Sequence, residues 1–386
     1  MNNILRKEKN NKFDKIKNFL NPDHVYIPIY EGYKLEVKTN SIIKKEQILM
    51  SKDNEYIYSP VSGKVLGKSS DILVNGQQVE AIVIENDFKE TVEKQKGCLR
   101  YINEYSRDNA LNLLKQYNAT KVDLDVNVNN LVINGCDIDP FEYTSSLIIN
   151  ENSDKILETI DALGIILNIK NVILAINNND SKNVINLTNN IGTYPNINLK
   201  LLPDIYPNSF KCLLINQVLS KKEIKDGYLY LTVEDILNIY NVLKKKKPII
   251  EKYVTVAGNC IDNEAIVNVK IGTTFKDIIN SVCNITDNKY NVVINGLING
   301  NVVSNLNEVV DFKTRSIFLS RKLDDVEKKC INCGLCNLKC PVGLNPKYIK
   351  EHKKADRTKC IKCGLCTFNC PSKINFKPYL GGHHEE

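Results

Sequence analysis

Eight of the thirteen cysteines fall into two short groups in the last sixty residues of the 386-residue chain. Both groups have the spacing C-x2-C-x2-C-x3-C-P, and their members are Cys330, Cys333, Cys336 and Cys340, then Cys360, Cys363, Cys366 and Cys370. This spacing is typical of bacterial proteins that bind two 4Fe–4S clusters through cysteine thiolates. We therefore predict two iron–sulfur clusters, whose chemistry is one-electron transfer.

In the two-cluster arrangement, the fourth cysteine of each group binds the cluster of the other group. The ligands predicted for the first cluster are Cys330, Cys333, Cys336 and Cys370, and those for the second are Cys360, Cys363, Cys366 and Cys340. Gly334 and Gly364 lie inside the two loops, where the backbone must approach a cluster closely. A pair of zinc ribbons is the alternative, but zinc ribbons use separated C-x2-C pairs.

The positive charge of the chain is concentrated around these cysteines. The chain carries a formal charge of +7, and residues 321–380 alone contain 14 Lys/Arg and 5 Asp/Glu. Aromatic residues that could stack on bases are not interleaved with the basic ones, so we exclude nucleic acid as a partner. We predict redox protein partners with an acidic docking face.

The beginning of the sequence, MNNILRKEKNNKFDKIKNFL, lacks the apolar run and the cleavage site of a signal peptide. No stretch reaches the roughly 18 consecutive apolar residues of a membrane span. We therefore expect a soluble, cytoplasmic protein, with peripheral attachment to the cytoplasmic face of the cell membrane as the alternative.

Composition shifts along the chain predict a multidomain α/β protein. Between a polar tail (1–23) and a short C-terminal tail (381–386), four units are expected: a barrel-sandwich-like β domain (24–95), a Rossmann-like α/β domain (96–248), a β-grasp-like domain (249–320) and an α-helical module with the cysteines (321–380). The 42% of hydrophobic residues can form ordinary globular cores.

In the α/β unit, the apolar runs LVING (131–135) and NVILAI (171–176) predict buried parallel strands. Between them we expect a helix from Ser153 to Gly164, and Thr232 with Asp235 forms an approximate capping box for a later helix. Cys136 follows the first strand, at the sheet edge where α/β sites gather. It is a weak redox candidate, and a buried structural cysteine is the favoured alternative.

Several strings in this order resemble the RnfC family, the iron–sulfur subunit of ion-translocating ferredoxin:NAD oxidoreductases, including proline-reductase-associated relatives. The strings are SPVSGKV (59–65), INGCDIDPF (133–141), Tyr206-Pro207, VTVAGN with IGTTF (254–275), and the two cysteine groups. The resemblance implies an SLBB domain at 249–320, a dicluster ferredoxin module, and an α/β domain similar to the NADH-binding flavoprotein subunit of respiratory complex I. That subunit's cofactors are FMN and NADH.

The glycine loops that FMN and NADH would need are missing from this chain. No glycine lies between Gly97 and Gly135, and Ser209, Phe210 and Lys211 replace the Gly-Gly-Glu expected after Tyr-Pro. Side chains would fill the space where backbone amides approach phosphates. We therefore predict an electron relay between a reduced donor, ferredoxin or NADH-linked, and an oxidoreductase such as an Rnf-type complex or proline reductase. The alternatives are an FMN-dependent NADH dehydrogenase subunit and a non-enzymatic adaptor with structural clusters.

Overall fold

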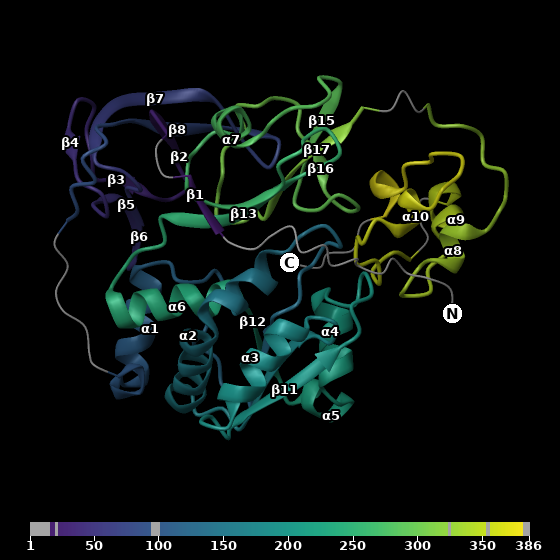
Figure 1. Ribbon diagram of the computed structural model, residues 1–386, viewed down its shortest axis with the longest axis horizontal. Helices are drawn as coiled ribbons and strands as arrows, with labels where there is room; N and C mark the ends of the chain where they lie inside the picture. Colours follow the sequence, from purple (N-terminus) through teal and green to yellow (C-terminus); the bar gives the residue numbers. More distant parts are fainter. Residues whose placement is uncertain (1–15, 20–21, 94–100, 323–325, 353–355, 381–386) are drawn as a thin grey trace.

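The computed structural model describes residues 16–19, 22–93, 101–322, 326–352 and 356–380 (Figure 1). These residues form four sheets and ten α-helices, which agrees with the predicted multidomain α/β class. Within this part of the chain, no helix combines the length and the apolar character needed to cross a bilayer.

The N-terminal β unit consists of two small antiparallel sheets, with strand orders β2-β8-β7-β4 and β3-β5-β6. The strands are β2 (His24–Pro28), β3 (Lys34–Leu35), β4 (Ile42–Ile43), β5 (Ile48–Lys52), β6 (Glu55–Tyr58), β7 (Gly63–Val74) and β8 (Gln77–Asn86). Alternate side chains of these strands, including Val25, Leu49 and Ile84, form one buried apolar cluster. Asn75 and Gly76 both have positive φ angles and turn β7 into β8.

The middle unit contains a parallel sheet of order β11-β10-β9-β12, so the predicted parallel arrangement of its apolar strands is confirmed. The strands are β9 (Asn130–Asn134), β10 (Asn171–Asn177), β11 (Ile197–Leu202) and β12 (Tyr228–Thr232). The helices are η1 (Ile102–Glu104), α1 (Arg107–Gln116), α2 (Thr144–Ile166), α3 (Ser181–Ile191), α4 (Lys211–Val218), α5 (Lys221–Lys225) and α6 (Val233–Lys245). Because the four strands are parallel, their carboxyl ends all lie at one edge of the sheet. This edge faces the cysteine module.

The helix expected to begin at Ser153 begins earlier, at Thr144, and is kinked at Asn152 (φ −137°, ψ 25°). The first turn is stabilised by Asp137, whose carboxylate accepts hydrogen bonds from the Ser145 N–H and the Ser146 hydroxyl, both 2.7 Å away. A cap outside the helix is difficult to predict from local sequence. The capping box of Thr232 and Asp235 at the start of α6 is confirmed.

The third unit is a six-stranded mixed sheet of order β1-β14-β13-β17-β15-β16, with α7 (Phe275–Val282) capped by Thr274. Its strands are β1 (Ile16–Phe19), β13 (Glu251–Ala257), β14 (Ala265–Lys270), β15 (Tyr290–Ile294), β16 (Asn301–Val302) and β17 (Ser316–Arg321). Strand β1 lies in the segment predicted to be a polar tail, but it pairs in parallel with β14. Phe19 packs on the core of this sheet, which explains why the segment is ordered there.

The cysteine module contains α8 (Leu335–Leu338), α9 (Pro346–Glu351), α10 (Leu365–Phe368) and η2 (Lys377–Tyr379). As expected, a helix begins at Pro346, with the Asn345 side chain as its cap. Figure 1 shows the module, in yellow, beside the loop that connects β15 and β16 and beside the segment before α4.

The SPVSGKV segment joins the N-terminal β unit to the six-stranded sheet through a buried charge. Lys270, which has no exposed surface, donates from Nζ to the Pro60 carbonyl at 3.0 Å and pairs with Glu90 at 2.9 Å. Lys45 also pairs with Glu90. Burial lowers the pKa of Lys270, and its hydrogen bond to Glu90 opposes that shift. The lysine is therefore retained in a buried position by partners from the other unit.

We predict that Lys270→Met weakens this joint. The change removes the charge-assisted hydrogen bond to the Pro60 carbonyl and the ion pair with Glu90, and should lower the free energy of unfolding by about 1.5–3 kcal/mol. Lys68→Met is the matched control, because Lys68 pairs with Glu80 in an exposed ion pair at 3.0 Å and such pairs contribute about 0–1 kcal/mol. Urea unfolding followed by circular dichroism measures both variants, and equal losses would contradict the role assigned to Lys270.

Candidate metal centres and the neighbouring pocket

Four cysteines from both groups line one cavity of about 280 Å³. They are Cys330, Cys333, Cys336 and Cys370. Their arrangement suits the four thiolate ligands of a 4Fe–4S cluster, because three come from one loop and the fourth from the other repeat. The ligand assignment itself stays a prediction.

The backbone around the cysteines directs N–H groups toward sulfur. The amide of Leu344 donates to Cys340 Sγ at 3.2 Å, and the amides of Asn332 and Lys362 lie 3.5 Å from the sulfurs of Cys330 and Cys360. Hydrogen bonds of this kind orient thiolate ligands and tune the potential of an iron–sulfur cluster. The local backbone therefore fits the predicted group.

In the second group, Cys360, Cys363 and Cys366 are buried. Burial is the largest influence that raises the pKa of Cys363, to about 12, followed by the neighbouring thiols of Cys366, Cys340 and Cys360. Burial likewise raises the pKa of Cys366 to about 11, with Cys360 and Cys340 adding to the shift. Cys340 of the first group thus lies close enough to act electrostatically on the second. A bound cation would reverse the preference of these thiols for the neutral form.

Among the residues with described positions, no three His, Cys, Asp or Glu side chains are arranged to hold a single metal ion. A mononuclear zinc site would bring its four sulfurs to about 2.3 Å from one ion. The case for iron–sulfur clusters therefore depends on the spacing of the cysteines, the cavity between them and the hydrogen bonds to sulfur.

The second cysteine loop is docked on the body of the protein. The hydroxyl of Tyr206 donates to the Cys363 carbonyl, and Nζ of Lys377 donates to the carbonyls of Asn299, at 2.9 Å, and Gly300. Gly364 has a φ of +77°, and a Cβ at this position would lie 2.5 Å from the Ile298 carbonyl oxygen. Glycine is therefore required here both by conformation and by space.

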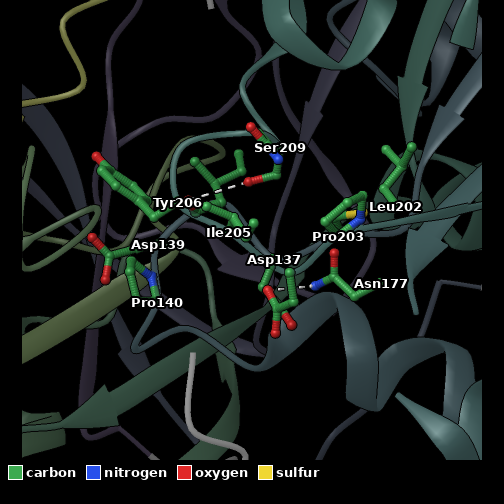
Figure 2. Close-up of a pocket in the computed structure, with 13 residues that line it drawn as sticks. Asp137, Asp139, Pro140, Asn177, Leu202, Pro203, Ile205, Tyr206 and Ser209 are labelled. Atoms are coloured by element: carbon green, nitrogen blue, oxygen red, sulfur yellow. Dashed lines mark hydrogen bonds between the residues drawn. The ribbon is translucent and has the colours of Figure 1, made fainter. Parts of the chain in front are cut away.

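A small pocket lies behind Tyr206, at the carboxyl edge of the parallel sheet. Figure 2 shows Asp137, Asp139, Asn177 and Ser209 around it, and Tyr206 forms one side. Its volume is about 10 Å³. A cavity of this size holds no more than about one water molecule. In this conformation the pocket itself is too small for a flavin ring or a nucleotide.

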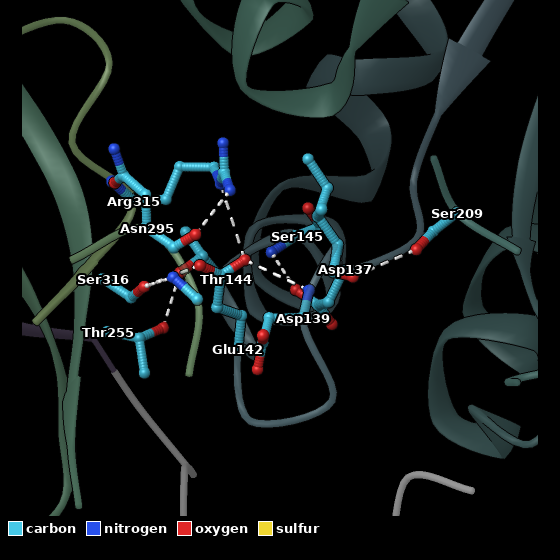
Figure 3. A network of polar contacts seen from close by, with 12 residues as sticks. Asp137, Asp139, Glu142, Thr144, Ser145, Ser209, Thr255, Asn295, Arg315 and Ser316 are labelled. Atoms are coloured by element: carbon cyan, nitrogen blue, oxygen red, sulfur yellow. Dashed lines mark hydrogen bonds and ion pairs between the residues drawn. The ribbon is translucent and has the colours of Figure 1, made fainter. Parts of the chain in front are cut away.

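The carboxylates of the INGCDIDPF string form hydrogen bonds with other parts of the protein (Figure 3). Asp139 accepts hydrogen bonds from the amides of Ile298 and Phe141, each at 3.1 Å. Asp137 caps α2 as described above. Asp139 therefore connects the sheet edge to the 295–300 loop, and Ile298 of that loop lies against Gly364 of the second cysteine loop.

Glu142 extends the same network into the six-stranded sheet. It accepts a hydrogen bond from the Ser316 hydroxyl at 2.6 Å and lies 3.6 Å from Nε of Arg315, while Thr144 and Thr255 share a hydrogen bond of 2.8 Å (Figure 3). Glu142 and Arg315 were not among the residues predicted from the sequence. Glu142 directly follows the INGCDIDPF string, but its partner lies more than 170 residues away, so sequence proximity alone does not reveal the pair.

Cys136 is buried, and its Sγ lies 3.8 Å from the Ala175 carbonyl oxygen. It packs with Val132, Leu202 and Leu214 in an apolar cluster. This environment fits the structural alternative, and a redox role for Cys136 stays a prediction.

We predict that Asp139→Ala loosens the joint between the sheet edge and the 295–300 loop. Loss of the acceptor leaves the buried Ile298 amide without this bond, and its hydrogen exchange should accelerate by roughly tenfold or more. Asp125→Ala is the control, because Asp125 pairs with Arg107 at 3.2 Å on an exposed surface. Exchange measured by mass spectrometry should change at 295–300 in the first variant only. Unchanged exchange there would refute the joint.

Known proteins resemble this chain along much of its length. The family described as Nuo51 FMN-binding domain matches residues 114–243. The RnfC component of the proton-translocating ferredoxin:NAD(+) oxidoreductase complex of Clostridium ljungdahlii is 27% identical over 85% of this chain and 78% of its own length. The equivalent component of the ion-translocating oxidoreductase complex of Buchnera aphidicola is 25% identical over 85% of this chain and 75% of its own length.

One solved structure, an NAD+-reducing NiFe hydrogenase in the air-oxidized state, overlaps 52% of this chain and 41% of its own chain at a TM-score of 0.43 and 11% identity. An overlap this weak carries no information on fold or function. The sequence relatives, in contrast, extend over most of the chain, and the family match covers the middle α/β unit. The chain is therefore RnfC-like, related along most of its length to the RnfC components of ion-translocating oxidoreductase complexes.

Proposed function

We propose that this protein relays single electrons through two 4Fe–4S clusters to or from a partner oxidoreductase. Its relatives are named as subunits of ion-translocating oxidoreductase complexes, which supports an electron-transfer role. In the proposal, the donor is a reduced ferredoxin or an NADH-linked protein. The partner is an Rnf-type complex or a reductase of the proline-reductase type.

The observation that carries this proposal is the cavity shared by cysteines of both repeats. Cys370 belongs to the second group, yet it lines the same cavity as Cys330, Cys333 and Cys336. This suits crossed ligation, in which Cys340 likewise completes the set of Cys360, Cys363 and Cys366. The clusters, when bound, supply reversible one-electron chemistry. The residues of the chain hold them close together, bury one set of thiols and direct amides toward sulfur.

The second candidate function is an FMN-dependent NADH dehydrogenase subunit. The match to a family described as FMN-binding favours it. The small pocket at the sheet edge and the bonded carboxylates of Asp137 and Asp139 count against it, because a flavin would have to displace these contacts. We therefore favour a relay without flavin. In this view the α/β unit is a scaffold that positions the second cysteine loop.

The proposal places the protein on the cytoplasmic side of the cell membrane, where an Rnf-type complex would bind it peripherally. The names of the relatives support this attachment. The basic character of residues 321–380, with 14 Lys/Arg and 5 Asp/Glu, supports an acidic docking face on the partner. The cysteine module is then the part of the chain that meets the partner.

Anaerobic purification followed by iron, sulfide and flavin analysis of one sample tests the proposal. We expect about eight irons and eight sulfides per chain, the content of two 4Fe–4S clusters, without stoichiometric flavin. The relay also requires that dithionite reduces the clusters and that they are reoxidised without unfolding of the protein. The adaptor alternative predicts that the clusters cannot be reduced reversibly. Stoichiometric FMN would instead support the dehydrogenase, and NADH would then be the first donor to test.

A further inference from the structure

The two cysteine loops have the same backbone shape but opposite surroundings. Each reads C-I-x-C-G-L-C, and the equivalent residues have matching positive φ angles: 58° at Asn332 and 54° at Lys362, then 73° at Gly334 and 77° at Gly364. A short helix, α8 or α10, follows each loop at the same position. The two loops therefore offer a neighbouring molecule nearly the same backbone surface.

The second loop shows what this surface binds. Ile361, Cys363 and Leu365 are buried in an apolar cluster that Tyr206 and Ile298 complete. The Tyr206 hydroxyl donates to the Cys363 carbonyl, and the Ile298 carbonyl lies against the Cα of Gly364. Apolar side chains and one hydrogen-bond donor, the Tyr206 hydroxyl, therefore cover the second loop.

The first loop presents the equivalent groups to solvent. Ile331 is 66% exposed, whereas its counterpart Ile361 is 8% exposed. Cys333 is exposed, and a Cβ at Gly334 would meet no atom of the described residues within 4 Å. Large exposed apolar side chains next to a redox site are a common feature of protein interaction surfaces. The outer face of this loop, at Ile331, Cys333 and Gly334, is therefore open, while Cys330 and Cys336 pack inward on the module.

We propose that the first loop, around Ile331, Cys333 and Gly334, is the docking surface for an external redox protein, and that this protein binds it as the body of the chain binds the second loop. The inference rests on the proposed function. The partner is a small iron–sulfur protein with an apolar centre and an acidic rim. It covers Ile331, and its contact brings its redox centre close to the site of the first cluster.

The charge around the open loop supports an acidic rim. Lys328 and Lys329 are exposed, and their backbone is bound to Ser372, which lines the cavity of the first cluster. Lys347 lines the same cavity, although it lies 3.9 Å from Glu351. Basic residues at the edge of an apolar contact steer an acidic partner and fix its orientation.

The exchange at this surface moves one electron and makes or breaks no bond. When the partner is reduced, it loses one electron and the site of the first cluster gains it. The thiols of the second group are buried against the body of the chain, so a protein bound at the first loop exchanges its electron with the first site.

The test measures binding and electron transfer with one probe, a purified acidic two-cluster ferredoxin. Isothermal titration with the oxidised probe, in which no electron moves, should give an affinity that falls as salt is added. Ile331→Glu should lower that affinity about tenfold or more, because it places a charge at the centre of the contact. Stopped-flow reduction by the reduced probe should slow in the same proportion. Dithionite should still reduce the variant completely, which shows that its clusters are retained.

Ile185→Glu is the matched control, because Ile185 is 58% exposed on α3 of the α/β unit. It should bind the probe within about twofold of the unmodified protein, the range of ordinary surface substitutions. Equal weakening by both variants, no effect of Ile331→Glu, or no binding of the probe at low salt would overturn the docking surface. If dithionite reduced no iron in the unmodified protein, the result would instead refute the proposed function.

Discussion

The contact between the second cysteine loop and the body of the protein determines which cysteines another molecule can reach. Gly364 must lie against the Ile298 carbonyl, and Tyr206 must reach the Cys363 carbonyl, so the module has one orientation relative to the two larger units. Because the two loops belong to one module, docking of the second leaves the first exposed. Duplication produced two equivalent loops, and this one contact makes them different. Burial of the second loop also raises the pKa of Cys363. Deprotonation of this thiol therefore depends more strongly on a bound cation than deprotonation of an exposed thiol would.

Tyr206 and Asp139, on one side of this contact, lie within the segment that matches a family described as an FMN-binding domain. The family match covers residues 114–243, and the INGCDIDPF string lies at the expected edge of the sheet. Here Asp139 binds the amide of Ile298, and the pocket behind Tyr206 is only large enough for about one water molecule. At this edge of the sheet, side chains of this chain therefore surround the pocket and bond to neighbouring units.

Local patterns in the sequence predicted the parts of the structure that depend on local physics. The capping box of Thr232 and Asp235, the apolar strands β9 and β10, and the helix beginning at Pro346 follow from neighbouring residues. The early start of α2 was missed because its cap, Asp137, belongs to the preceding loop, and β1 was missed because its partner strand lies about 250 residues away. The cysteine spacing predicts two sets of ligands, and four of these cysteines, one from the second group, line one cavity. It could not predict which loop is buried, since that depends on Tyr206 and Ile298 from other units.

The most direct test of the account uses two variants and electron paramagnetic resonance. Cys370→Ala should retain the cluster of the second group, and Cys340→Ala should retain that of the first, if ligation is crossed. A water-soluble dysprosium complex, added to each reduced variant, accelerates the relaxation of clusters near the surface. We predict strong acceleration in Cys340→Ala, where the exposed site remains, and little in Cys370→Ala, where the buried site remains. The reverse order, or equal acceleration in both variants, would contradict the account.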